Sequence, residues 1–134
     1  MIFIGIDSGT QSTKALALDA ETGEILASSQ EAYDILGSLP NGHMEQDPCN
    51  WINAVRNVIG SCVDALGERK LEIKGIGVSG QQHGLVVLDE NDDVIRPAKL
   101  WCDTSTVDQC QQFIRDFEGD AGLIELTGNT VLPG

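Results

Sequence analysis

The sequence is poor in basic residues, and this shortage excludes several kinds of partner. Eight lysines and arginines stand against 21 aspartates and glutamates, which gives the 134-residue chain a net charge of −13. Nucleic acids and anionic membranes are bound largely through basic surface. We therefore expect no nucleic-acid partner and no membrane partner. A small phosphorylated ligand stays compatible with this charge, because backbone N–H groups and one metal ion can neutralise it locally.

Long apolar runs and paired metal ligands are also missing. No stretch approaches the ~20 apolar residues that span a bilayer, and the first residues lack the basic leader and apolar segment of a signal peptide. The four cysteines include no Cys-x-x-Cys pair and the two histidines share no ligand-like spacing, so no zinc site is expected. Free thiols in a cytoplasmic protein are the plain interpretation, with a disulfide left open. The length predicts a single domain over residues 1–134.

The opening stretch places polar side chains directly after a short apolar run. Residues 2–7 predict a strand buried on both faces, and Asp7 stands at its carboxyl end. Across residues 8–14, hydroxyls and N–H groups can donate to phosphate oxygens, Gly9 allows close approach and Lys14 adds a positive charge. Asp7 can hold a hydrated magnesium ion. A plain hairpin turn explains the same residues, so both interpretations stay open at this point.

The remaining chain predicts a mixed α/β sheet. Strands are expected at 14–19, 25–29 and 73–79, the first two forming an antiparallel meander with the opening strand. A helix is expected from Pro48, capped by Asp47, to a stop at Gly67. A hairpin over 85–95 and a second helix with its apolar stripe over 107–117 follow. No helix follows the first strand, which excludes a Gly-x-Gly-x-x-Gly nucleotide fold and a Walker P-loop.

A second polar cluster follows the strand at 73–79. Gln81, Gln82 and His83 lie between glycines, and their amides and imidazole can donate or accept hydrogen bonds. Because ligands gather outside the carboxyl ends of strands in such sheets, these groups suit the hydroxyls of a polyol or sugar. Trp101, close to Asp103, offers an indole face that packs well against a sugar. A polar turn with a surface histidine, and a core tryptophan, are the competing structural explanations.

Four motifs together resemble a known family. The run from Asp7 to Lys14 resembles the opening of the FGGY carbohydrate kinases, which belong to the wider actin and Hsp70-like ATPase fold. Glu45-Gln46-Asp47-Pro48 with Trp51 also fits that family, and the runs 80–84 and 100–104 look most like its xylulokinase branch. The resemblance covers essentially the whole chain, with the motifs in the family's order. Glycerol kinases carry Arg-Glu where this sequence has Gln82-His83.

The resemblance implies a fold, a reaction and roles for individual residues. The fold would be an amino-terminal lobe with a ribonuclease-H-like core, paired with a second lobe that grips ATP and Mg²⁺ in the cleft. The reaction would be transfer of the γ-phosphoryl group to the terminal hydroxyl of D-xylulose. By family position, the phosphate-binding residues would be Thr10, Gln11, Ser12 and Lys14, the metal-binding residue Asp7, and the substrate-binding residues Gln82, His83, Trp101 and Asp103.

The resemblance also marks what the chain would not supply. In the family the catalytic base is an aspartate that would lie beyond residue 134, so no catalytic residue is expected here and we interpret the chain as an amino-terminal fragment. A homodimer of the full enzyme is left open. The alternatives are other members of the family, namely ribulokinase, gluconokinase and glycerol kinase, or a non-catalytic binding module built from the same lobe.

Overall fold

The structure is a computed structural model that describes residues 1–133. The strands are β1 (Ile2–Ser8), β2 (Ser12–Asp19), β3 (Ile25–Ala32), β4 (Glu45–Gln46), β5 (Ile73–Gly80) and β6 (Ala98–Lys99). The helices are α1 (Pro48–Leu66), the 3-10 helix η1 (Gly67–Glu72), α2 (Val107–Asp116) and α3 (Asp120–Thr127). The chain divides into two compact units, the first of Met1–Ile35 with Asp47–Gln82 and the second of Leu36–Gln46 with the chain from His83 onward.

The first unit is built on a four-stranded sheet in the order β3-β2-β1-β5. β1 is antiparallel to β2, where Ile4 lies opposite Ala17, and parallel to β5, where Ile4 lies opposite Ile76. β3 continues the antiparallel meander from β2. The predicted mixed sheet is confirmed, and β1 is a central strand with a partner on each side.

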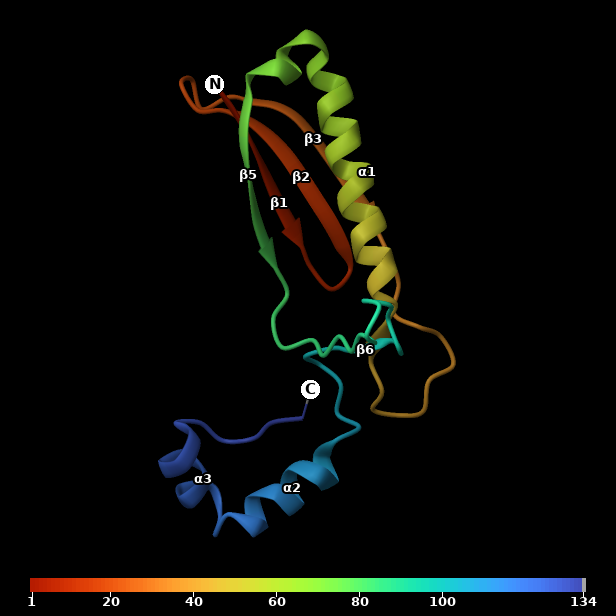
Figure 1. Ribbon diagram of the computed structural model, residues 1–134, viewed down its shortest axis with the longest axis vertical. Helices are drawn as coiled ribbons and strands as arrows, with labels where there is room; N and C mark the ends of the chain where they lie inside the picture. Colours follow the sequence, from red (N-terminus) through yellow and green to blue (C-terminus); the bar gives the residue numbers. More distant parts are fainter. Residues whose placement is uncertain (134) are drawn as a thin grey trace. The chain divides into compact units, whose positions relative to one another are not determined.

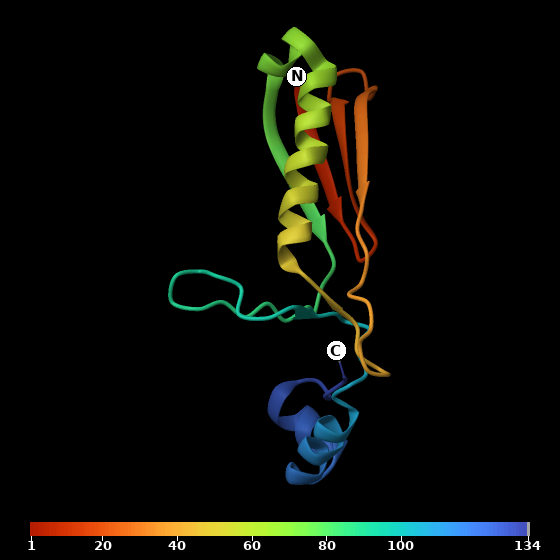
Figure 2. The ribbon, with the colours of Figure 1, turned by 90° about the vertical axis from the view of Figure 1, so that its right-hand side faces the viewer.

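Helix α1 covers one face of this sheet (Figures 1 and 2). The core between them contains Ile2, Ile4, Ile6, Ala15, Ala17, Val58, Cys62 and Leu66. The helix begins as predicted, because the Asp47 carboxylate accepts a hydrogen bond from the Cys49 N–H at 2.9 Å and Pro48 occupies the first turn. It ends at Gly67, whose φ of 56° lies in the region that glycine tolerates best.

The other face of the sheet is open, and here the prediction of a strand buried on both faces is wrong. Phe3 is 40% exposed, Leu16 37% and Ile25 59%. The apolar run of β1 therefore serves two environments, with Ile2, Ile4 and Ile6 under α1 and the residues between them on the open face. Apolar composition alone could not distinguish this case, since both faces carry residues that tolerate burial.

The second unit contains the β4–β6 pair and helices α2 and α3. Leu85 pairs with Lys99 by an isolated bridge, and its N–H donates to the Lys99 carbonyl at 3.1 Å. The predicted hairpin over 85–95 forms its turn, but its strands reduce to a single bridge between Leu88 and Val94. Leu85 and Leu88 are both largely exposed, so no burial rewards longer pairing here. The second helix is confirmed, and α3 is an addition.

Two further findings concern the chain within the described residues. All four cysteines are free thiols, with Cys62 and Cys110 buried. No helix within residues 1–133 has the length and apolar character needed to cross a membrane.

Candidate functional site

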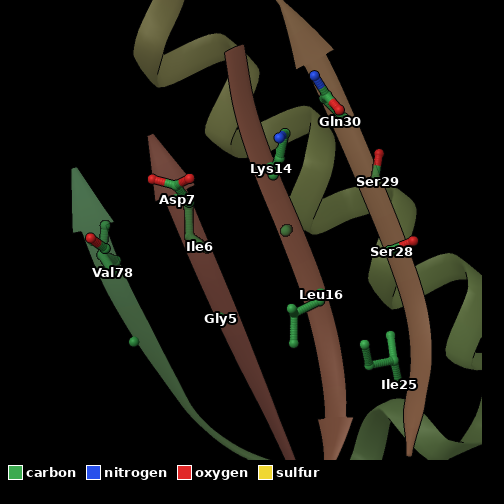
Figure 3. A pocket seen from close by; sticks show the side chains of 13 residues that line it. Gly5, Ile6, Asp7, Lys14, Leu16, Ile25, Ser28, Ser29, Gln30 and Val78 are labelled. Atoms are coloured by element: carbon green, nitrogen blue, oxygen red, sulfur yellow. The ribbon is translucent and has the colours of Figure 1, made fainter. Parts of the chain in front are cut away.

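The open face of the sheet carries a hollow that is charged at the end nearest the carboxyl end of β1. Asp7 and Lys14 are direct partners across β1 and β2, and both line a hollow of about 940 Å³. Figure 3 shows Asp7, Lys14 and Gln30 towards the carboxyl ends of β1 and β3, with apolar Leu16 and Ile25 further along the sheet. The arrangement places a carboxylate and an ammonium at one end of the hollow and apolar side chains at the other end. This combination suits a ligand with both charged and apolar parts.

The turn between β1 and β2 is closed by its own hydrogen bonds. The Gly9 N–H donates to the Ser12 carbonyl at 3.0 Å, and the Gln30 amide donates to the Ser12 hydroxyl at 3.1 Å. Thr10 and Gln11 line a second hollow of about 650 Å³, separate from the one at Asp7. The structure thus gathers the predicted phosphate-binding residues around one turn, but Lys14 lines the first hollow, Thr10 and Gln11 line the second, and Ser12 lines neither.

Gly9 is not required by the backbone of this turn. Its φ lies outside the left-handed region, and a Cβ there would meet the Ser12 carbonyl oxygen at 3.6 Å, an ordinary van der Waals contact. The expectation that glycine permits the approach of a phosphate stays a prediction.

Gln81 belongs with the phosphate turn, although the sequence grouped it with the two residues that follow. Its N–H donates to the Ser8 carbonyl at 2.9 Å, and its Oε1 accepts from the Thr10 hydroxyl at 3.1 Å. Its Nε2 is buried and has no partner within the described residues. A buried amide donor without a partner is costly unless a water or ligand oxygen meets it. This position fits a ligand with acceptor oxygens near the turn.

The predicted sugar-binding residues lie on both sides of the boundary between the units. Gln82 is the last residue of the first unit, whereas His83, Trp101 and Asp103 belong to the second. His83 has a φ of +61°, a conformation that costs free energy for a residue with a Cβ and that is frequent at functional sites. Gln82 and His83 are exposed, and Trp101 is 56% exposed. Trp101 is therefore not the core tryptophan of the competing explanation.

Asp103 differs from the other predicted sugar residues because it is fully buried. Its Oδ2 accepts from the Met44 N–H at 2.8 Å and from the Lys99 ammonium at 3.2 Å. Its Oδ1 accepts from the N–H and the hydroxyl of Ser105. Burial raises the pKa of Asp103, but the hydrogen bonds from Ser105, Met44 and Lys99 outweigh it and hold the pKa below its ordinary value of 3.8. The carboxylate is ionised and its oxygens are occupied.

Lys99 joins Asp103 to a second buried carboxylate, that of Glu45. The ammonium lies 3.2 Å from a Glu45 oxygen, and the Arg96 guanidinium lies 2.8 Å from the same atom. Burial raises the pKa of Glu45, but the bonds from Lys99 and Arg96 bring it below its ordinary 4.5. His43, Glu45 and Asp103 bring ligand atoms within 4.8 Å of one another. The Lys99 ammonium already supplies the positive charge that two such carboxylates need.

Sequence reasoning missed two residues of these sites and grouped a third with the wrong neighbours. Lys99 had no motif around it, because its partners Glu45 and Asp103 become neighbours only when β4 pairs with β6. Tyr33 lay outside every predicted strand and helix, yet its hydroxyl and N–H both bond the phosphate turn. Gln81 was recognised, but assigned to the sugar. A polar residue just after a buried strand was the available signal, and it does not say which neighbouring strand end it meets.

Comparison with known proteins places the fold and then the family. A solved structure described as a xyloylose kinase from Brucella ovis has a TM-score of 0.85 and 35% sequence identity, over 99% of this chain and 27% of that one. The fold of this chain is therefore that of part of a sugar kinase, which confirms the predicted actin and Hsp70-like class. Residues 2–134 match the amino-terminal domain of the FGGY family of carbohydrate kinases. The chain belongs to this family.

Curated relatives agree with this assignment. Xylulose kinase from Haemophilus influenzae is 38% identical over 95% of this chain, and xylulose kinase from Streptomyces coelicolor is 38% identical over 96%. The chain spans about a quarter of the length of these relatives, 26% and 25% respectively.

Proposed function

We propose that this chain is part of an ATP-dependent pentulose kinase whose sugar is D-xylulose and whose product is D-xylulose 5-phosphate. The observation that carries the proposal is the 38% identity to a curated xylulose kinase along nearly the whole chain. The pair Gln82-His83 favours a pentulose over glycerol, because glycerol kinases resemble this chain in the first motif but carry Arg-Glu at these two positions. Ribulokinase and gluconokinase activities are the nearest alternatives.

In this proposal the turn and the strand ends of the first unit hold the phosphates of ATP. The hydroxyl of Ser12 and the amide of Gln11 donate to phosphate oxygens, and Lys14 offsets the phosphate charge. The Thr10 hydroxyl donates to a phosphate once it turns away from Gln81 Oε1. Asp7 is an exposed carboxylate beside Lys14. Mg²⁺ is commonly held by one or two carboxylates together with phosphate oxygens, so this residue fits the metal. When bound, Mg²⁺ neutralises charge on the transferred phosphoryl group.

The sugar hydroxyls are met by exposed side chains at the end of β5 and after β6. Gln82 can donate and accept, and His83 can do either through its ring nitrogens. Trp101 offers an exposed indole face to the sugar's C–H groups. We propose an indirect role for Asp103, since both its oxygens already accept hydrogen bonds from the protein. It holds the segment that carries Trp101.

We further propose that residues 1–134 act as part of the first lobe of a two-lobed kinase. Phosphoryl transfer relies on positioning, charge neutralisation and a base that accepts the hydroxyl proton. This chain supplies groups for the first two tasks, and the base and the grip on adenine belong to the rest of the kinase. Support comes from the share of the relatives' length that the chain covers. A cytoplasmic location and a homodimer belong to the same proposal.

The test is a coupled assay of ADP release by the complete gene product. We expect the highest kcat/KM for D-xylulose among D-xylulose, D-ribulose, gluconate and glycerol. Gln82→Ala should raise the sugar KM or lower kcat, with the loss of one neutral hydrogen bond costing ~0.5–1.5 kcal/mol, about 2- to 13-fold. Gln112→Ala is the matched control, because within residues 1–133 that amide bonds Asp116 and Arg115 alone, on the exposed surface of α2.

The outcomes separate the candidate functions. Preference for another sugar would move the protein to another branch of the family. If no sugar or polyol causes ADP release, the kinase proposal is wrong and the binding-module alternative gains. A sugar profile unchanged by Gln82→Ala would remove this residue from the substrate site.

A further inference from the structure

Three carbonyl oxygens of the β1–β2 turn are engaged within the protein. The Gly9 carbonyl accepts from the Tyr33 hydroxyl at 2.5 Å, the Gln11 carbonyl accepts from the Tyr33 N–H at 3.1 Å, and the Ser12 carbonyl accepts from the Gly9 N–H at 3.0 Å. Carbonyl oxygens carry partial negative charge and repel a phosphate. Engaging them inside the fold lowers this repulsion, which matters in a chain of net charge −13.

Tyr33 makes two of these three bonds from outside the turn. It directly follows β3, and its N–H and its phenol reach two different carbonyls. The side chain thereby connects the end of the third strand to the loop between the first two. A loop of polar residues is otherwise free to present either its N–H groups or its carbonyls to a ligand. The two bonds from Tyr33 hold the loop in the arrangement in which the Gly9 and Gln11 carbonyls bond the protein.

The phenol also ends a chain of hydroxyls whose direction can be deduced. Thr13 Oγ1 is fully buried and lies 3.2 Å from the Tyr33 oxygen and 3.2 Å from Ser8 Oγ. The single phenol proton goes to the Gly9 carbonyl, which can only accept. Tyr33 must therefore accept from Thr13, and Thr13 from Ser8. Each proton in this chain points towards the turn, and loss of the phenol oxygen would leave the buried Thr13 hydroxyl without its acceptor.

Tyr33 also lines the hollow that contains Thr10 and Gln11. We propose that Tyr33 is a positioning residue, which holds the β1–β2 turn in the arrangement that accepts the phosphates of ATP. The proposal rests on the proposed kinase function. Tyr33 acts through the backbone of the turn, whereas the neighbouring hydroxyls and Lys14 act on the phosphates themselves.

The test uses Tyr33→Phe in the complete gene product, because this change removes the phenol oxygen and keeps the ring. Calorimetric binding of Mg-ATP and of D-xylulose is measured separately, along with KM for each and the melting temperature. Loss of one neutral hydrogen bond predicts Mg-ATP binding weakened by about fivefold, with sugar binding changed by less than about twofold. Val58→Ala is the control, because it opens the core under α1 without touching the turn.

The results distinguish this proposal from the kinase proposal. Selective weakening of Mg-ATP binding in Tyr33→Phe, absent in Val58→Ala, supports the positioning role. If the affinities for Mg-ATP and D-xylulose fall equally, together with the melting temperature as in the control, the role of Tyr33 is merely structural and the positioning proposal is wrong. Unchanged binding of Mg-ATP would also overturn the proposal. If the wild type binds Mg-ATP but phosphorylates no sugar, the kinase proposal is wrong. Selective weakening of Mg-ATP binding in Tyr33→Phe would in that case still support the positioning role of Tyr33. A wild type that does not bind Mg-ATP overturns both.

Discussion

Replacing Asp103 with asparagine should unfold the second unit at a much lower denaturant concentration. The two side chains have the same shape, but one carboxylate oxygen becomes an NH₂ group. Oδ1 accepts two bonds from Ser105, and Oδ2 accepts from Met44 and Lys99. Whichever way the amide turns, one of these pairs of donors faces another donor. Asp103→Asn therefore breaks bonds on one side and leaves the Lys99 ammonium with a single carboxylate partner.

The size of the effect follows from burial. Removing one partner from a buried ion pair costs about 3–5 kcal/mol when the other charge is left without compensation. In Asp103→Asn the Lys99 ammonium keeps the Glu45 carboxylate at 3.2 Å, so we take the lower end of that range. Hydrogen bonds to charged groups contribute about 1.5–3 kcal/mol each, so the lower end of that range is a conservative choice. With an m-value of about 1.5 kcal/mol/M in urea, a loss of about 3 kcal/mol lowers the unfolding midpoint by roughly 2 M.

The two tryptophans make the assay specific, because Trp51 lies on α1 in the first unit and Trp101 in the second. In a Trp51→Phe background, fluorescence during a urea titration reports the second unit alone. Asp92→Asn is the matched control: Asp92 is exposed, and asparagine tolerates its φ of +65°. The control should change stability by less than about 0.5 kcal/mol.

An Asp103→Asn midpoint equal to that of the control would refute this reasoning. The carboxylate would then not anchor the unit, and the original prediction that Asp103 binds sugar directly would be favoured over an indirect role.

Three further outcomes are expected. The pKa values of Asp103 and Glu45 are lower in the folded chain than their ordinary 3.8 and 4.5, so the unfolded chain binds more protons in acid. The stability from both groups should be full above about pH 5 and fall as the pH drops further, so the urea midpoint linked to them should fall between about pH 5 and pH 3. Gly42→Ala should lower the melting temperature, with a cost of about 1–3 kcal/mol, because its φ is +86° and a Cβ would meet a neighbouring hydroxyl oxygen at 3.0 Å; an unchanged melting temperature would contradict this. Under native conditions a thiol reagent should modify exposed Cys49 and spare buried Cys62, as judged by mass spectrometry of peptides, and rapid labelling of Cys62 would contradict the packing of α1.

Local signals in the sequence were sufficient where one stretch determines its own structure. Asp47, Pro48 and Gly67 mark both ends of α1 correctly, because capping needs only neighbours in sequence. The apolar run of β1 predicted a strand but not which of its faces is buried, since the burial of Phe3 depends on what packs over the sheet. The meander and its parallel partner β5 followed from strand order and the intervening helix.

The candidate site was predictable as a list of residues and less so as an arrangement. Polar groups after the strands indicated residues 7–14 and 81–83, because strand ends gather at one edge of a sheet, and their roles stay predictions. The partition between the hollow at Asp7 and the hollow at Gln11 depends on which way each side chain leaves the turn. No signal in the sequence around Asp103 indicated the lysine whose ammonium bonds its carboxylate. Direct binding of a sugar by Asp103 stays a prediction.

The central position of β1 has a consequence for the growing polypeptide. Its partner β2 follows at once, but its other partner β5 ends at Gly80, about 50 residues after β3 ends. At ~5–20 residues per second, synthesis of that interval takes roughly 2–10 s. Throughout it, the β5 side of β1 presents unpaired N–H and C=O groups, the kind of edge that templates association with another chain. The nascent chain therefore passes through a period of several seconds in which its most apolar strand needs protection.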